Sequence, residues 1–326
     1  MNGKDCFPSE NLVVGVNEIN LGLCVNDSDE NVGEVLLSFE DKIIEKEFFV
    51  DGSVEKDLGY YIITESGTSD VFYPEVVKSG SLVNWTFMNG SVIIGNSLSH
   101  NFLEDGSKKV SLMIDNVSQV TSINFFSDNI VSMFHLENFL ELNNLNLKSN
   151  NLEDIGDISV LVKLQSVLLG GNNLVDIGEV SDLLKLQSLS IYNNKLVDIG
   201  KVNDLVLLIY LSLGGNQFID IGKVDNLTKL TKLLVSENNL IDIGNLSKLI
   251  NLELLYLNNN NFSKEYLSNV VVQLWNNRVD LKNNNCEIKL DENNGLSDDA
   301  IARIEGTGSY FGNGLKGDGV IVTYLD

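Results

Sequence analysis

The chain has 326 residues, which is enough for two or three domains, and its hydrophobic content of 43% is typical of a soluble globular protein. Its formal net charge of −24 excludes nucleic acid as a partner and disfavours anionic membrane surfaces, because such binding needs clustered Lys and Arg. No run of about 20 apolar residues occurs, so no membrane insertion is predicted.

Residues 1–57 contain four runs with strand character, at 11–16, 19–25, 34–39 and 43–50, and predict a small β-domain that we expect to serve in attachment. No basic segment followed by an apolar stretch opens the chain, so no signal peptide is predicted. The acidic loop at 27–33 has two interpretations, a calcium site or a solvated turn. Its glycine falls one place late for an EF-hand loop, which favours the turn.

Residues 58–117 show short strands separated by turns. Three motifs follow one another there: Trp85-Thr-Phe-Met-Asn-Gly90, His100-Asn-Phe102 and the alternating Val110-Ser-Leu-Met-Ile114. Together they resemble the PKD family of immunoglobulin-like domains, although the usual acidic residues around the turn are missing. The resemblance implies an Ig-like β-sandwich that acts as a spacer or adhesion module.

A repeat of 22 residues dominates the second half of the chain. Each copy begins L-x-x-(L/V)-x-(L/I/V)-x-x-N-x-(L/F). Successive copies start at Leu142, Leu164, Leu186, Leu208, Leu230 and Leu252. An earlier copy starts at Val120 with Asp128 in the asparagine position, and a last partial copy is predicted through Val279, Leu281, Asn284 and Cys286.

Two polar columns run through the repeats. The asparagines are predicted to point inward and to hydrogen-bond the backbone where the chain leaves each strand. They are Asn150, Asn172, Asn194, Asn216, Asn238 and Asn260. The aspartates of a repeated Asp-Ile-Gly either form a metal-binding ladder or cap short helical turns, and we favour capping. They are Asp154, Asp176, Asp198, Asp220 and Asp242.

This array resembles a leucine-rich repeat, and its period and Asp-Ile pair resemble the bacterial internalin type between about Val120 and Leu290. The glycine after each Asp-Ile departs from that type, as does the lack of a nearby proline. The resemblance implies an α/β solenoid over 118–290, with a parallel sheet on the concave face and short 3₁₀ turns on the convex face. One such repeat cannot bury its apolar face alone, so stacking is obligatory.

The C-terminal end departs from the repeat. Ser263 is predicted to cap a helix at 263–275 that closes the solenoid, because Leu267, Val270, Val271 and Leu274 form one apolar stripe. Residues 291–326 are a cap or tail, with a second helix from Ser297 to Ile304 and a closing strand at 319–325. The match of 312–317 to G-x-G-x-x-G lacks a following helix and is rejected.

No catalytic motif occurs anywhere in the sequence. The two histidines, His100 and His135, belong to the PKD-like motif and to the first repeat, and the three scattered cysteines indicate neither disulfides nor a zinc site. We therefore expect no enzyme activity, no cofactor and no bound metal.

The outward strand positions of the repeats, the third, fifth and seventh of each copy, are expected to form a binding surface rich in Tyr, Ser, Gly and Asn. This composition is that of antibody paratopes, although exposed strand positions also favour such residues without any function. The candidate binding residues are Leu168, Tyr192, Tyr210, Leu234, Leu254, Tyr256, Ser190 and Ser212.

The domain order and the ending Leu296-Ser-Asp-Asp-Ala-Ile-Ala-Arg-Ile304 and Val320-Ile-Val-Thr-Tyr324 resemble fibre or surface proteins of phages that infect Bacteroidetes-type bacteria. This resemblance implies a virion component (capsid decoration or tail fibre). The repeats would bind a protein or glycan on a host cell, and the N-terminal domains would bind other virion proteins. A bacterial cell-surface adhesin of the internalin type and a cytoplasmic scaffold are the alternatives. In each of these settings the chain could associate into a homo-oligomer.

Overall fold

The computed structural model describes residues 10–14, 17–21, 32–39, 42–49, 60–64, 74–78, 83–87, 92–95, 97, 99, 108–114, 117–291, 296–306, 314–317 and 320–325. The chain forms two compact units, Met1–Lys56 and Asp57–Asp326. His100 of the PKD-like motif and most of the acidic loop at 27–33 lie outside the described residues.

The first unit contains two antiparallel hairpins. Strand β1 (Glu10–Val14) pairs with β2 (Asn17–Leu21), and β3 (Val32–Phe39) pairs with β4 (Lys42–Phe49). All four strands fall close to the positions that the sequence predicts. A role of this unit in attachment stays a prediction.

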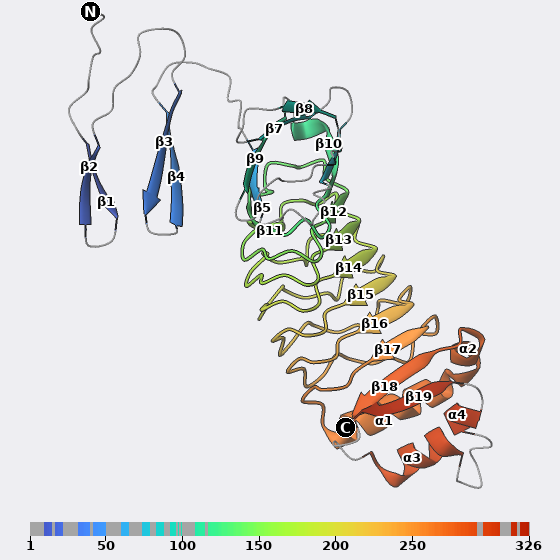
Figure 1. The fold of residues 1–326 in the computed structure, drawn as a ribbon. Helices are drawn as coiled ribbons and strands as arrows, with labels where there is room; N and C mark the ends of the chain where they lie inside the picture. Colours follow the sequence, from blue (N-terminus) through green and yellow to red (C-terminus); the bar gives the residue numbers. More distant parts are fainter. Residues whose placement is uncertain are drawn as a thin grey trace, which may run out of the picture. The chain divides into compact units, whose positions relative to one another are not determined.

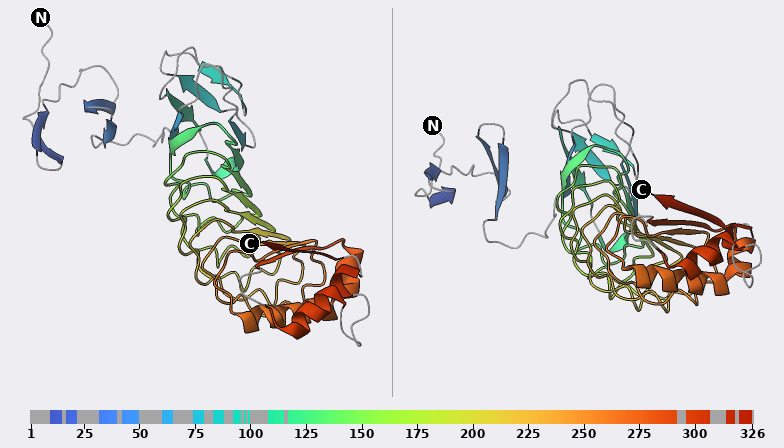
Figure 2. Two further views of the ribbon diagram at one scale, coloured as in Figure 1. Left: turned by 60° about the horizontal axis from the view of Figure 1, so that its bottom comes forward. Right: turned by 90° about the horizontal axis from the view of Figure 1, so that it is seen from below.

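The second unit is organised around a ten-stranded sheet with the order β19-β18-β17-β16-β15-β14-β13-β12-β10-β6 (Figure 1). Its strands are β6 (Glu75–Lys78), β10 (Val120–Asn124), β12 (Asn144–Asn146), β13 (Ser166–Leu168), β14 (Ser188–Ser190), β15 (Tyr210–Ser212), β16 (Lys232–Leu234), β17 (Leu254–Tyr256), β18 (Glu287–Asp291) and β19 (Ile321–Leu325). From β10 to β19 neighbouring strands are parallel, and from β10 to β17 paired residues are 22 apart in sequence. Figure 2 shows this sheet on the inner side of the curved unit, which confirms a solenoid with a concave parallel sheet.

The solenoid core repeats with the same period. The middle residue of each three-residue strand is buried, as at Val167 and Leu189, and Ile177 and Val180 close the core from the convex side. Burying one such side chain contributes roughly 1.5–3 kcal/mol relative to exposure. Since these side chains pack against the next repeat as well as their own, each repeat depends on its neighbours for stability.

The convex segments contain the expected short turns, closed by i to i+3 hydrogen bonds such as Leu161 N–H to Ile158 O at 3.0 Å. Between the turns the chain bonds the next repeat, as in Ile158 N–H to Ile177 O at 2.9 Å. In the described part of the chain only η1 (Val117–Gln119), ahead of β10, is a 3₁₀ helix.

The N-terminal end of the solenoid is covered by a five-stranded sheet with the order β11-β5-β9-β7-β8. Its strands are β5 (Tyr60–Thr64), β7 (Asn84–Phe87), β8 (Val92–Ile94), β9 (Lys108–Met113) and β11 (Ile130–Met133). Strand β11 belongs to the first repeat, and β6 pairs with β10, so this segment shares both sheets with the solenoid. The boundary expected at residue 117 therefore does not separate two compact units. A PKD-like sandwich stays a prediction.

The same segment shares its core with the first repeat. The buried Trp85 donates from Nε1 to Gly95 O at 2.7 Å. Its ring meets that of Phe125, at the end of β10, edge to face with centroids 6.4 Å apart. Because the apolar end of the first repeat is buried beneath this packing, the described strands β5 to β9 act as the N-terminal cap of the array.

The C-terminal cap is helical. Helix α1 (Lys264–Asn276) begins after Ser263, whose side chain accepts from Tyr266 N–H, and it buries the predicted apolar stripe. The Tyr266 hydroxyl accepts from Ile243 N–H at 3.2 Å and donates to Gly244 O at 3.0 Å, which ties the cap to the preceding repeat. The remaining helices are α2 (Arg278–Asn283), α3 (Asp298–Glu305) and α4 (Gly314–Gly317).

The predicted last partial repeat is wrong. Residues 278–283 form α2, with Val279 64% exposed, and the next strand of the sheet is β18, in which Ile288 pairs with Leu255. The spacing of Val279, Leu281 and Asn284 fits a strand or a helix equally well, and the preceding helix settles the choice. Cys286, just before β18, is buried, and burial raises the pKa of its thiol to about 12, so it is a poor nucleophile at neutral pH.

Candidate binding surface

The asparagine column joins each repeat to the one before it. Asn172 is representative: its Oδ1 accepts from Leu152 N–H at 3.1 Å, and its Nδ2 donates to Leu147 O and Leu169 O, each at 2.9 Å. Asn150, Asn194, Asn216, Asn238 and Asn260 make the same three contacts in their own repeats. These side chains replace backbone hydrogen bonds that the turn after each strand cannot make.

The aspartate column binds its own backbone. Each carboxylate accepts from the N–H of the glycine two residues later, for example Asp176 Oδ1 from Gly178 N–H at 2.8 Å. The other four aspartates do the same. Each glycine has a positive φ, between 73° and 93°, which explains why glycine follows Asp-Ile. The aspartates thus form side-chain turns and cap no helix, which corrects the expected role.

Lysines neutralise part of this column. Lys201 Nζ lies 3.1 Å from Asp220 Oδ2, and Lys223 Nζ lies 2.6 Å from Asp242 Oδ2. The backbone N–H of Gly222 and the ammonium of Lys201 hold the pKa of Asp220 below its usual value. Burial raises the pKa of Asp242, but the bonds from Lys223 and Gly244 outweigh it, and the pKa is lowered.

We predict that calcium and excess EDTA leave the melting temperature unchanged. The aspartate oxygens are directed at backbone N–H groups and lysines, and no group of three or more His, Cys, Asp or Glu side chains in the described residues is placed to hold a metal. Differential scanning calorimetry with and without each additive is the measurement. A shift of several degrees on adding EDTA would contradict this assignment.

The predicted binding residues lie on the concave face, but they differ in accessibility. Tyr192, Tyr210 and Tyr256 are half-buried, as are Leu168, Leu234 and Leu254. Ser190 and Ser212 are only 3% and 4% exposed. The face therefore presents mainly rings and aliphatic side chains.

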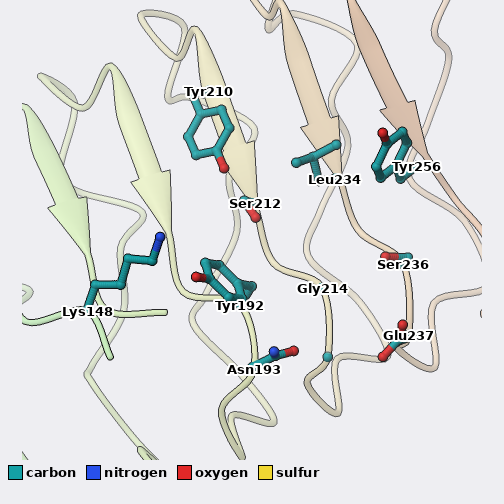
Figure 3. Close-up of a pocket in the computed structure, with 11 residues that line it drawn as sticks. Lys148, Tyr192, Asn193, Tyr210, Ser212, Gly214, Leu234, Ser236, Glu237 and Tyr256 are labelled. Atoms are coloured by element: carbon teal, nitrogen blue, oxygen red, sulfur yellow. The ribbon is translucent and has the colours of Figure 1, made fainter. Parts of the chain in front are cut away.

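An open pocket of about 370 Å³ lies on this face across β14 to β17. Figure 3 shows Tyr192 and Tyr210 on one side of Ser212, with Leu234 and Tyr256 on the other. The pocket is lined by Lys148, Tyr192, Asn193, Tyr210, Ser212, Gly214, Gly215, Leu234, Ser236, Glu237 and Tyr256. Five of the eight candidate residues are brought together here, whereas Leu168, Ser190 and Leu254 are outside this lining.

The orientation of the pocket tyrosines is set by their neighbours. The Tyr192 ring lies over Gly170, where a Cβ would overlap ring atoms, and Lys148 Nζ lies 5.4 Å from the centre of that ring. Tyr256 donates from its hydroxyl to Glu287 Oε1 at 2.9 Å. Lys289 Nζ lies 3.9 Å from the centre of the Tyr256 ring. These contacts hold two rings in place before any partner binds, which lowers the entropy cost of binding.

Two charged residues of the pocket, Glu237 and Lys148, are not among the binding residues predicted from the sequence. Glu237 occupies the eighth position of its repeat, just outside the three outward positions considered. The only signal in the sequence is a contrast with the neighbouring repeats, whose eighth positions are the uncharged Gly215 and Asn259.

The chain was compared with protein families, curated proteins and solved structures. No protein-family model matches the sequence, and no curated protein matches it. Among solved structures, internalin C2 of Listeria monocytogenes is 24% identical with a TM-score of 0.36, over 45% of this chain and 75% of that one. The functional domain of InlJ from the same organism is 20% identical with a TM-score of 0.39, over 59% of this chain and 49% of that one.

A leucine-rich-repeat protein of Leptospira interrogans is 26% identical with a TM-score of 0.39, over 52% of this chain and 54% of that one. The chain thus spans about half the length of the InlJ domain and of the Leptospira protein. The pairing of strands 22 residues apart establishes the solenoid independently of these likenesses.

Proposed function

We propose that this is a non-enzymatic recognition protein that binds a protein partner on the concave face of its repeats, with the pocket over β14 to β17 at the centre. The observation that carries the proposal is the contrast in charge between the strongly acidic chain and this nearly uncharged face. A chain with a net charge of −24 has gathered three tyrosines, leucine, serines and glycines in one depression that contains a single acidic side chain, Glu237.

Two further features support a partner of macromolecular size. The pocket is open and extends over four strands, so a contacting segment would cross roughly 14 Å at a strand spacing of about 4.8 Å. Large rigid rings combined with small hydroxyl and glycine residues make contacts at low conformational cost, as in antibody paratopes.

None of the helices in the described ranges is long and apolar enough to cross a bilayer.

The test is selection from a library of random dodecapeptides on the purified protein. Selected peptides are expected to bind the wild type and to lose binding to a variant in which Tyr192, Tyr210 and Tyr256 are replaced by Ala. Selection that enriches nothing, or peptides that bind both proteins equally, would contradict the proposal.

For the biological setting, we propose a virion surface component, in which residues 1–57 and 58–117 attach the protein to other virion proteins and the repeats face outward. The support is the resemblance of the domain order and of the C-terminal residues 296–304 and 320–324 to phage surface proteins. A bacterial adhesin of the internalin type is the alternative. Immunogold labelling of particles and of cells with an antibody to the repeats separates the two: label confined to cells would contradict the virion placement.

A further inference from the structure

The eighth residue of every repeat adopts a left-handed backbone conformation. The column comprises Ser127, Ser149, Gly171, Asn193, Gly215, Glu237 and Asn259, with φ between 50° and 72°. This conformation turns the chain out of the strand so that the following asparagine can enter the core. Glycine and asparagine tolerate it well, and most other residues do not.

Glu237, Ser127 and Ser149 are the members of this column that are neither glycine nor asparagine, and Glu237 has the largest side chain of the three. It has φ of 56°, yet a glutamate side chain gains no local hydrogen bond that would favour the left-handed region, and the preceding repeat places Gly215 at the same position. Backbone strain of this kind persists where the surrounding structure enforces it, and it concentrates at functional sites. Three members of the column line the pocket: Asn193, Gly215 and Glu237.

The surroundings of Glu237 form a notch at the edge of the pocket. Asn193 and Glu237 flank Gly215, two strands apart and therefore about 10 Å apart at the backbone. A Cβ on Gly215 would overlap the Asn193 amide oxygen, so glycine at this position lets that amide lie against the Gly215 backbone. In Figure 3 Asn193 and Glu237 lie on either side of Gly214, with the Tyr192 ring next to Asn193 and Ser236 above Glu237.

The Glu237 carboxylate has no structural task within the described residues. The side chain is exposed, and no hydrogen bond or ion pair to a described residue is formed by its oxygens. Its backbone N–H bonds Asn258 O at 3.0 Å and its carbonyl accepts from Asn216 N–H at 3.2 Å, and these bonds would be kept by any residue at this position.

We propose that this notch receives a lysine or arginine side chain of the protein partner, with the Glu237 carboxylate and the Asn193 amide oxygen as acceptors and the Tyr192 ring as an adjoining face. The proposal rests on the recognition function proposed above and adds the charge of the partner. A carboxylate and an amide oxygen that accept from the same cation combine an ion pair with a charge-assisted hydrogen bond. The net charge of −24 attracts a basic segment at long range.

The other charged residue of the pocket gives the partner a direction. Lys148 comes from the repeat of β12, four strands before that of Glu237, but its Nζ lies 5.4 Å from the centre of the Tyr192 ring, which is two strands from Glu237. The two charged groups are therefore separated by about two strand spacings, roughly 10 Å, which about three residues of an extended segment cover. A basic side chain of the partner therefore binds at the Glu237 end. Further along the same segment, a backbone carbonyl group or an acidic side chain accepts from the Lys148 ammonium.

The experiment uses the full chain and the peptides selected on it, each paired with a copy in which every Lys and Arg is changed to Gln. Selected peptides are expected to be enriched in Lys or Arg, and the Gln copies are expected to bind about tenfold more weakly. Glu237→Gln, which removes the charge and keeps the shape, should weaken the basic peptides by about three- to tenfold and leave the Gln copies unaffected. The matched control is Glu153→Gln, which changes the net charge equally at an exposed residue outside the pocket.

A stability measurement separates this role from a structural one. Glu237→Asn should lose basic-peptide binding like Glu237→Gln, but it should melt about 2–4 °C higher than Glu237→Gln, because asparagine tolerates the left-handed backbone. Basic peptides that bind Glu237→Gln as tightly as the wild type would overturn the proposal, as would a Glu237→Asn variant that loses stability as well as binding. Peptides that depend on the three tyrosines but carry no basic residue would overturn it and leave the proposed recognition function intact.

Discussion

Replacing Asn150 with Ala is expected to lower the free energy of unfolding by about 2–3 kcal/mol. Asn150 is 6% exposed and its Oδ1 accepts from Asp128 N–H at 3.1 Å and Ile130 N–H at 2.9 Å. Its Nδ2 donates to Phe125 O at 2.6 Å and to Leu147 O at 2.9 Å. Alanine leaves these backbone groups without their side-chain partner in a buried turn, and an unsatisfied buried group costs about 1–3 kcal/mol.

The control for this change is Asn151→Ala, one residue further along. Asn151 is exposed, and in the described structure only its backbone N–H, bonded to Ile130 O at 2.9 Å, is tied to the fold. Urea titration followed by tryptophan fluorescence is the measurement, because Trp85 and Trp275 lie in the two caps and report on both ends of the array. If Asn150→Ala and Asn151→Ala had the same midpoint, the asparagine column would not stabilise the repeats as argued.

The sequence predicts the repeated part of this fold well, because in a solenoid the spatial neighbours of a residue are the residues 22 positions away. The same period places Val167 beside Leu189 in the core, and it places Tyr192 on the concave face of the sheet. The helix after Ser263 is also predictable, since a capping side chain and an apolar stripe are local signals.

The ends of the array could not be predicted in the same way. The pairing of β6 with β10 and of β5 with β11 joins residues far apart in sequence without any repeated pattern. At residues 279–286 the spacing of apolar residues fitted both a partial repeat and α2, and the neighbouring helix decided between them. A period describes contacts between equivalent positions, whereas a cap is by definition not equivalent to a repeat.

The candidate site was predictable only in part, for a related reason. Alternation along a strand identifies which residues point outward, but it does not identify which outward residues are covered. Ser190 and Ser212 occupy outward strand positions yet are nearly fully buried. Glu237 lies after its strand, where direction depends on the left-handed backbone rather than on alternation.

Replacing Tyr192, Tyr210 and Tyr256 together with Ala is expected to weaken binding of the selected peptides by well over a hundredfold. Central aromatic anchors typically contribute about 2 kcal/mol or more each, and about 1.4 kcal/mol corresponds to a tenfold change in affinity. The three contributions are not additive within one pocket, but the loss of binding free energy should still exceed two tenfold steps in affinity. The array should stay folded, because the three rings are only half-buried and the strand residues beneath them, such as Leu211, form the core.

The matched control replaces Val175, Val197 and Ile219 with Ala. These three side chains come from consecutive repeats, are more than half exposed, and are outside the pocket lining. Binding measured by isothermal titration calorimetry should be unchanged in this variant, and circular dichroism should show the same fold for both variants and the wild type. If the control variant lost binding and the tyrosine variant kept it, the partner would bind along the column of Val175, Val197 and Ile219. The concave pocket would then owe its tyrosines to strand packing alone, since aromatic side chains favour exposed strand positions without any partner.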